Sequence, residues 1–198
     1  MPKKEGILVI AVTGTPGVGK TRFAGELSKA IGVKAVEVND VVEGEKLFTG
    51  IDESGSKIVK MQELKKELKA IEVRASKSGD KAIILVGHLL ADLKLEYDTS
   101  IVIRASLREL VSRLEERGYQ KEKVRENLVS ESIDYCGAQI SGRSKEIYEA
   151  EDADQKAIVV SYLKALVSGK HPEKPNLPSI NKMEEMLELV YEGNSYGL

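Results

Sequence analysis

The sequence predicts an α/β protein in which helices cover both faces of a five-stranded parallel sheet. Short apolar runs alternate with longer amphipathic runs along the chain, which is the pattern of repeated β-α units. A glycine-rich turn follows the first apolar run and leads into the first amphipathic one. The chain has 198 residues, enough for one domain with a full hydrophobic core. We therefore expect one main domain over residues 1–168 and a terminal segment over residues 169–198.

Five apolar segments are expected to form the strands of the sheet. The first is apolar throughout, as a central strand that is covered on both faces should be. The last is the least regular, because half of its residues are charged. The five segments are residues 7–12, 33–38, 81–86, 100–105 and 144–151.

Helices are expected where apolar residues recur at helical spacing. Gly32 stands where a C-terminal cap would end the first helix, and Ser106 with Glu109 forms a capping-box pattern. Between the second and third helices, residues 49–57 are rich in Gly, Asp and Ser and predict a mobile loop. The expected helices cover about residues 20–31, 39–48, 61–76, 107–117, 121–138, 156–167 and 181–192.

The composition of the chain limits the partners and the cellular compartment that we expect for it. A formal net charge of -2 gives no reason to expect a nucleic-acid or membrane surface as partner, and it leaves RNA contact open. The single cysteine, Cys136, cannot build a disulfide framework, and we expect it to be a small buried hydrophobe in a reducing compartment. Without a signal peptide or an apolar stretch long enough to span a bilayer, a cytoplasmic location is expected.

The glycine-rich turn matches the phosphate-binding motif G-x-x-x-x-G-K-[ST] over residues 14–21. Glycines allow successive backbone N–H groups to turn inward around phosphate oxygens, and the helix that begins at Lys20 adds its dipole. Lys20 should reach the β- and γ-phosphates of ATP, and the Thr21 hydroxyl should coordinate Mg²⁺. The motif therefore predicts a P-loop that binds ATP and Mg²⁺.

The P-loop alone does not name the phosphoryl acceptor. No N-K-x-D motif for guanine follows it, so a GTPase is disfavoured. The small size of the chain and the loop-rich insertion after the second strand favour a kinase of small molecules.

Four stretches of the sequence resemble a known family. They are the P-loop Gly14–Thr21, Val38-Asn39-Asp40, Gly87-His88, and Arg113–Tyr119 followed by Lys121–Asn127. Over about residues 7–168 the chain resembles the small adenylate kinase family that is linked to ribosomal small-subunit maturation. This family comprises the sixth adenylate kinase isoenzyme of eukaryotes and its archaeal relatives.

The resemblance implies a P-loop NTPase three-layer α/β/α sandwich with an insertion that binds nucleoside monophosphate (NMP) at about residues 37–60. A short lid would lie at about residues 116–126. The implied reaction is ATP plus AMP to two ADP, with a secondary ATPase activity. The resemblance also implies transient binding of a small-subunit ribosomal protein during ribosome biogenesis and rRNA processing.

The resemblance assigns roles to residues that match the family motifs. His88 and Arg117 would act at the transferring phosphoryl group together with Lys20, and a positive charge there counters the charge that develops in transfer. Asp40 and Arg104 would bind the monophosphate substrate. The residues expected to hold ATP and Mg²⁺ are Gly17, Val18, Gly19, Lys20, Thr21, Arg22, Arg117 and Lys156.

Two positions depart from the family pattern. Relatives carry an acidic residue two positions before the histidine, where this chain has Val86, so the metal would rely on Thr21, the phosphates, and Asp40 or Asp92. Soon after the Asp40 position the family has an arginine that clamps the acceptor phosphate. Here that position is Glu43, and the nearby lysines offer point charges instead of a bidentate fork.

Other interpretations of these features stay open. Arg113 and Arg117 lie four apart among glutamates and fit solvated surface charges, and His88 fits a hydrogen-bonded residue at a strand end. Residues 170–178 hold three of the five prolines and predict a stiff linker to the last helix. The apolar stripe of that helix, with Met183 and Leu187 among its members, fits either its own domain or a protein partner. Besides the kinase, an ATP-gated assembly factor and a kinase of another small alcohol remain possible.

Overall fold

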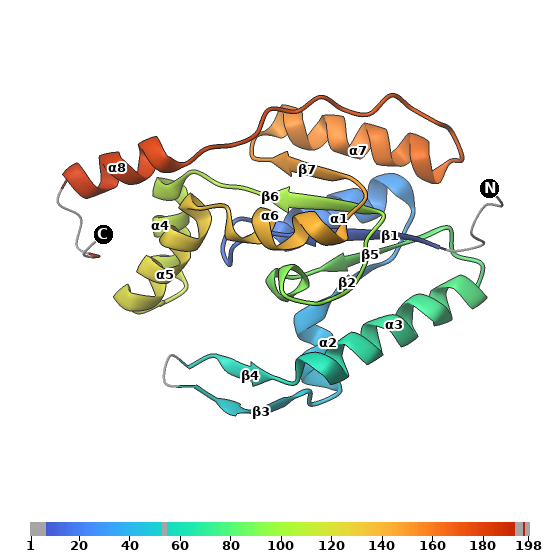
Figure 1. The fold of residues 1–198 in the computed structure, drawn as a ribbon, viewed down its shortest axis with the longest axis horizontal. Helices are drawn as coiled ribbons and strands as arrows, with labels where there is room; N and C mark the ends of the chain where they lie inside the picture. Colours follow the sequence, from blue (N-terminus) through green and yellow to red (C-terminus); the bar gives the residue numbers. More distant parts are fainter. Residues whose placement is uncertain (1–6, 53–54, 193–195, 197–198) are drawn as a thin grey trace.

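The centre of the molecule is a five-stranded parallel sheet, which confirms the expected fold class (Figure 1). The structure, a computed structural model, describes residues 7–52, 55–192 and 196. The strands lie in the order β2-β5-β1-β6-β7, and each pairs with its neighbour in parallel. They are β1 (Leu8–Thr13), β2 (Ala35–Glu37), β5 (Ala82–Val86), β6 (Thr99–Ile103) and β7 (Ile147–Ala150).

Helices cover both faces of this sheet, and β1 shows how the sequence divides between them. Ile10 and Val12 pack on the side of α1 (Lys20–Ile31) and α7 (Ala153–Val167). Val9 and Ala11 pack on the other side, which α3 (Met61–Lys77), the short η1 (His88–Ala91) and α6 (Tyr135–Ile140) cover. A strand buried on both faces must be apolar throughout, as this one is.

The caps expected from the sequence set several helix ends. Helix α1 has the expected bounds, and Gly32, with φ 67°, donates its N–H to the Ser28 carbonyl. Ser106 accepts from the Glu109 N–H at 3.3 Å at the start of α4 (Leu107–Glu116). Helix α7 begins three residues before the expected position, because Asp152 and Gln155 form a capping box.

The single helix expected over residues 121–138 is wrong. Two helices occupy this stretch, α5 (Lys121–Ser132) and then α6. Asp134 breaks the run with a left-handed φ of 50°, and its carboxylate accepts the Gly137 N–H at 3.2 Å. Aspartate tolerates this conformation because its short side chain can hydrogen-bond locally.

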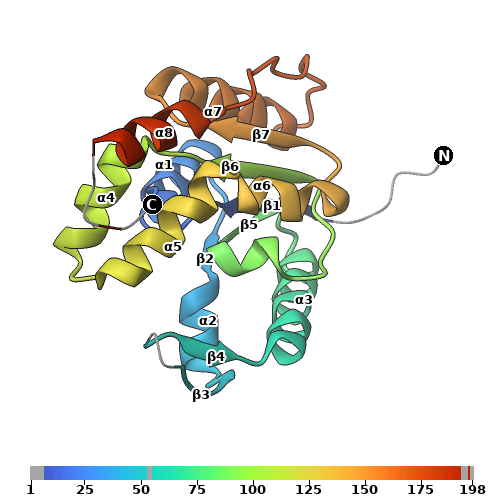
Figure 2. The ribbon, with the colours of Figure 1, turned by 60° about the vertical axis from the view of Figure 1, so that its left-hand side comes forward.

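The mobile loop expected over residues 49–57 is also wrong. The chain forms an antiparallel hairpin here from β3 (Phe48–Ile51) and β4 (Lys57–Val59), in which Phe48 pairs with Val59. The Lys57 ammonium lies 4.5 Å from the centroid of the Phe48 ring. The hairpin lies with α2 (Val38–Gly44) at one end of the molecule, beside α3 (Figures 1 and 2). Helix α2 starts at Val38 and lacks the expected side-chain cap.

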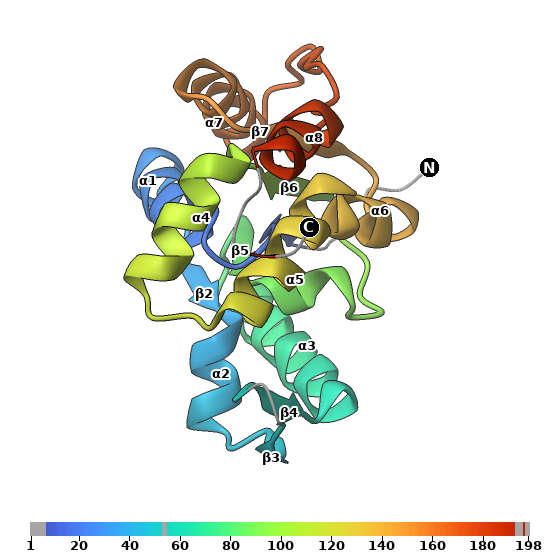
Figure 3. The ribbon, with the colours of Figure 1, turned by 90° about the vertical axis from the view of Figure 1, so that its left-hand side faces the viewer.

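The terminal segment runs back along the sheet edge. Residues 170–182 form no helix or strand and run alongside β7. Lys174 forms an ion pair with Glu146 at 2.8 Å, and Ile180 donates its N–H to the Glu149 carboxylate at 3.3 Å. The short η2 (Ser141–Arg143) precedes β7. Helix α8 (Met183–Tyr191) then lies beside α4 and α5 (Figure 3).

Helix α8 only partly fits the expected stripe. Leu189 is buried and Met186 packs on the main core, whereas Met183, Leu187 and Val190 stay exposed. Elsewhere, Cys136 is buried and free, as expected. No helix in the described part of the chain has the length and apolar character needed to cross a bilayer.

Candidate active site

The P-loop connects the end of β1 to the start of α1, and two of its glycines have a clear structural reason. Gly14 has φ 138°, and a Cβ there would lie 2.3 Å from the Ile103 carbonyl oxygen. Gly19 has φ 102° and occupies the N-cap of α1. No side chain of the described residues caps the first backbone N–H groups of this helix. Positive φ is strained for other residues, so glycine is needed to turn the loop onto the helix N-terminus.

Lys20 and Thr21 open α1 in a position that suits a bound polyphosphate and its metal ion. The Lys20 ammonium donates to the Thr15 carbonyl at 2.9 Å and, among the described residues, forms no ion pair with a carboxylate. Burial lowers the pKa of Lys20 to about 8, and the nearby Arg117 charge acts in the same direction. A partly desolvated cation beside a helix N-terminus and a hydroxyl fits the triphosphate with Mg²⁺.

This lowered pKa predicts a pH dependence of ATP binding. A bound triphosphate raises the pKa of Lys20 again, so binding must take up a proton once the pH exceeds about 8 in the free protein. ATP affinity should therefore fall by up to about tenfold per pH unit above this value. Fluorescence titration with a labelled ATP from about pH 7.5 to about 9.5 measures the slope. The matched control is Lys20→Arg, whose guanidinium stays charged throughout and should give a flat profile; equal slopes for both proteins would contradict the assignment.

One cavity, which we name the α7 cavity, lies between the P-loop, α4 and α7. Its volume is about 660 Å³. Arg22, Arg113 and Arg117 line its polar part, and Ala157 and Val160 of α7 give it an apolar wall that suits a nucleotide base. The predicted ATP-binding residues that it brings together are Gly17, Val18, Gly19, Arg22, Arg117 and Lys156.

Lys156 is held at the rim of the α7 cavity. Its ammonium donates to the Glu151 carbonyl in the turn before α7. Burial lowers the pKa of Lys156, and the Arg113 charge lowers it further. The charges of Lys156 and Arg113 repel each other, so a bound anion would stabilise this pair as well as Lys20.

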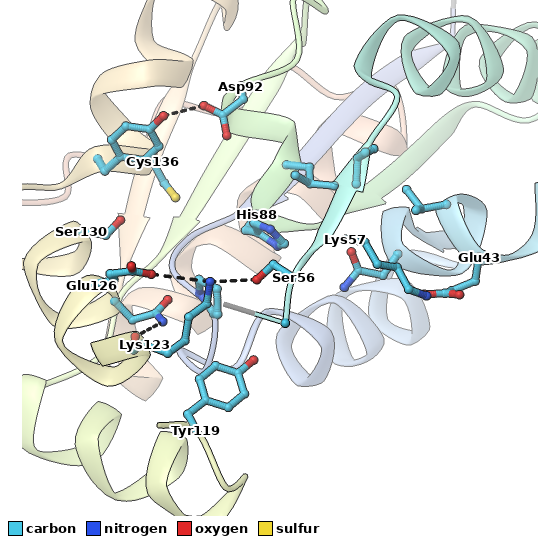
Figure 4. A pocket seen from close by; sticks show the side chains of 18 residues that line it. Glu43, Ser56, Lys57, His88, Asp92, Tyr119, Lys123, Glu126, Ser130 and Cys136 are labelled. Carbon is cyan, nitrogen blue, oxygen red and sulfur yellow. Dashed lines mark hydrogen bonds and ion pairs between the residues drawn. The ribbon is translucent and has the colours of Figure 1, made fainter. Parts of the chain in front are cut away.

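A second cavity, the hairpin cavity, lies on the other side of the P-loop and has a volume of about 510 Å³ (Figure 4). Its walls come from α2, the β3–β4 hairpin, η1, α5 and α6. Lys123 of α5 donates to the Ser56 hydroxyl at 2.9 Å and so links the α5 wall to the hairpin. Lys57 of the hairpin forms an ion pair with Glu43 of α2, and both residues line this cavity. Cations therefore lie on both walls of the cavity.

His88 faces the hairpin cavity from the turn after β5. Burial lowers the pKa of His88 to about 4, and the Lys20 charge acts in the same direction. The imidazole is therefore neutral at physiological pH and can donate or accept a hydrogen bond without adding charge. Its neighbour Asp92 accepts from the Tyr135 hydroxyl at 2.7 Å.

Adjacent residues of the P-loop line these two cavities. Pro16 lines the hairpin cavity, and the next residue, Gly17, lines the α7 cavity. The turn after α4 also contributes to both cavities, because Arg117 lines the α7 cavity and Tyr119 lines the hairpin cavity. Two ligands bound in these cavities would meet at the P-loop.

Two predicted substrate-binding residues lie elsewhere. Asp40 is exposed on α2 and lines a different cavity, with Glu37 and Lys34. Arg104 is only 1% exposed, and its guanidinium is engaged by the acidic residues Glu131, Asp134 and Glu149 and by backbone carbonyls. Contrary to expectation, Arg104 lies in a buried ion-pair cluster and lines neither the α7 cavity nor the hairpin cavity.

Sequence reasoning missed Glu131, which connects this buried cluster to the P-loop. Its carboxylate accepts from Arg104 Nε at 2.8 Å, from the Thr15 hydroxyl at 2.6 Å and from the Ala105 N–H at 3.2 Å. Glu131 is 2% exposed, although a glutamate in a charged helix normally faces solvent. No local pattern marks it, because its partners are far away in the sequence.

Comparison with known proteins places this site in a family. The profile of the AAA domain family matches residues 10–134. A Methanocaldococcus jannaschii protein described as "Putative adenylate kinase" is 35% identical over 79% of this chain and 85% of its own length. A Pyrococcus furiosus protein of the same description is 33% identical over 94% of this chain and 86% of its own length.

Solved structures show the same fold at low sequence identity. A deoxyadenosine kinase from M. mycoides with bound dATP has a TM-score of 0.50 at 16% identity, over 79% of this chain and 99% of that one. A sugar kinase from Janibacter sp. HTCC2649 has a TM-score of 0.52 at 11% identity, over 84% of this chain and 99% of that one. The P-loop, the two cavities and the archaeal relatives agree, and the chain belongs to the family of P-loop nucleotide kinases whose archaeal members carry that adenylate kinase description.

Proposed function

We propose that the protein is a nucleoside monophosphate kinase that transfers the γ-phosphoryl group of ATP to AMP and forms two ADP. The observation that carries this proposal is the pair of cavities that meet at the P-loop, with Pro16 on one side and Gly17 on the other. A hydrolase needs only one nucleotide cavity and access for water. A second cavity at the same point, with Lys57 and Lys123 in its walls, instead suits a second nucleotide.

On the donor side, ATP lies with its base in the α7 cavity and its phosphates on the P-loop. The backbone amides of residues 17–19 and the Lys20 ammonium hold the β- and γ-phosphates. Thr21 would hold Mg²⁺, which would neutralise phosphate charge when it is bound. Arg117, whose charge already acts on Lys20, balances the charge that spreads over the transferring group.

On the acceptor side, AMP lies in the hairpin cavity. Its phosphate is already an anion at neutral pH, so the reaction needs no general base and depends on positioning. Lys57 and Lys123 take the place of the arginine that the sequence lacks, and neutral His88 orients the phosphate by a hydrogen bond. The contact of Lys123 with Ser56 brings the lid against the insertion and excludes water, the competing acceptor.

The test is ADP formation from Mg·ATP with AMP, CMP, GMP or UMP. We expect AMP to stimulate ADP formation well above the ATP-only rate. Lys20→Met should lower the stimulated rate by about 100-fold to 1,000-fold, because it removes one charge at the transferring group. ATP binding without stimulation by any monophosphate would overturn the proposal.

A second candidate function is an ATPase that assists assembly by binding a small-subunit ribosomal protein. The exposed residues Met183, Leu187 and Val190 on α8 support it, because they form an apolar stripe at helical spacing. In the same assay, stimulation by the ribosomal protein and by no monophosphate would favour this candidate over the kinase.

A further inference from the structure

We propose that Glu37, at the end of β2, holds the water shell of the Mg²⁺ ion that accompanies ATP. This role rests on the ATP site of the proposed function and is independent of the acceptor. In P-loop NTPases the ion is held by the P-loop Ser or Thr and by an acidic residue at a strand end. Here β5, the strand beside β1, ends in Val86 and carries no carboxylate there.

The sheet register places Glu37 directly beside that position. In the parallel pair of β2 and β5, the Cα of Glu37 is the partner of the Cα of Val86. Paired residues on neighbouring strands point to the same face of a sheet. Val86 packs in the core together with Phe23 of α1, so Glu37 also faces the side of α1 and the P-loop.

The Glu37 side chain is long enough to compensate for its place on β2, one strand further from the P-loop than Val86 on β5. Neighbouring strands are about 4.8 Å apart, so the carboxylate starts one strand spacing further from the P-loop than an acid at Val86 would. Glutamate is one methylene longer than aspartate, which recovers part of that distance. The ion also keeps several waters, so the carboxylate needs to reach only the water shell and not the ion itself.

The surroundings of the Glu37 carboxylate agree with this position. Burial raises the pKa of Glu37, and so does the charge of Asp40, while hydrogen bonding from Thr21 and the charge of Lys20 lower it. The carboxylate therefore lies within hydrogen-bonding reach of the Thr21 hydroxyl and feels the charge of Lys20. Of the two alternatives suggested by the sequence, Asp40 is exposed on α2, and Asp92 is engaged by Tyr135 across the hairpin cavity.

The experiment measures metal binding without catalysis. Mn²⁺ replaces Mg²⁺, a non-hydrolysable ATP analogue replaces ATP, and electron paramagnetic resonance counts the free Mn²⁺. We expect Glu37→Gln to weaken Mn²⁺ binding to the nucleotide complex by about 10-fold to 100-fold, the usual effect of losing a residue that orients metal-bound groups. Glu37→Asp should give a smaller loss. The matched control, Glu45→Gln, removes an exposed carboxylate at the end of α2 and should change nothing.

A second titration in EDTA separates metal binding from damage to the P-loop. The proposal requires that Glu37→Gln bind the metal-free nucleotide as tightly as the parent chain does. Equal Mn²⁺ affinity in both proteins would overturn it, and so would an equal loss of affinity with and without metal. Because no monophosphate enters the experiment, its outcome is independent of whether AMP is the acceptor.

Discussion

Replacing Arg104 with methionine is expected to lower the free energy of unfolding by about 3–5 kcal/mol, the usual cost of breaking a buried ion pair. Arg104 is 1% exposed, and it holds Glu131, Asp134 and Glu149 together at distances of 2.8–3.0 Å. Methionine fills similar space but leaves these carboxylates without their cation. Urea unfolding followed by circular dichroism measures the loss.

Arg108→Met is the matched control for this substitution. Arg108 pairs with Glu192 across the α4–α8 contact, but its side chain is 56% exposed. Exposed pairs contribute about 1 kcal/mol or less, so this variant should unfold close to the parent chain. A loss below about 1 kcal/mol for Arg104→Met would contradict the structural role and reopen a role at the substrate.

The elements that the sequence predicted well carry their signal locally. Helix α1 has the expected bounds because Lys20 follows the P-loop glycine and Gly32 provides the C-terminal cap. The strands of the central sheet appear as short apolar runs because both of their faces are buried. Their predicted bounds differ from the observed ones by at most three residues, which is usual where a strand continues into a loop.

The elements that the sequence missed depend on distant partners. The hairpin of β3 and β4 looked like a loop because its polar residues face solvent or the hairpin cavity, and pairing across it decides its structure. Asp134 breaks a helix that periodicity alone would continue.

Some residues of the candidate site can likewise be recognised from the sequence, whereas others depend on distant partners. The P-loop residues are recognisable because a fixed spacing of glycine, lysine and threonine meets phosphate geometry. Arg104 and Glu131 are ordinary charged residues in the sequence, and only the fold shows that they form a buried cluster that contacts the P-loop through Thr15. Glu37 and Lys123 likewise gain their positions from strand register and from the approach of α5 to the hairpin.

A ligand that fills both cavities at once is expected to bind far more tightly than either nucleotide alone. Two adenosines joined through five phosphates can place one base in the α7 cavity and the other in the hairpin cavity, with the phosphates across the P-loop. Linking two sites in this way raises affinity by about 100-fold to 10,000-fold, because the second binding event becomes intramolecular. Two adenosines joined through only two phosphates are the control, because this linker is too short to span both cavities.

Isothermal titration of the five-phosphate compound tests the central claim, that donor and acceptor nucleotides meet at the P-loop. The account predicts one molecule bound per chain, at least about 100-fold more tightly than ATP, and no such gain for the two-phosphate control. An affinity within about tenfold of that for ATP, or two molecules bound per chain, would contradict it.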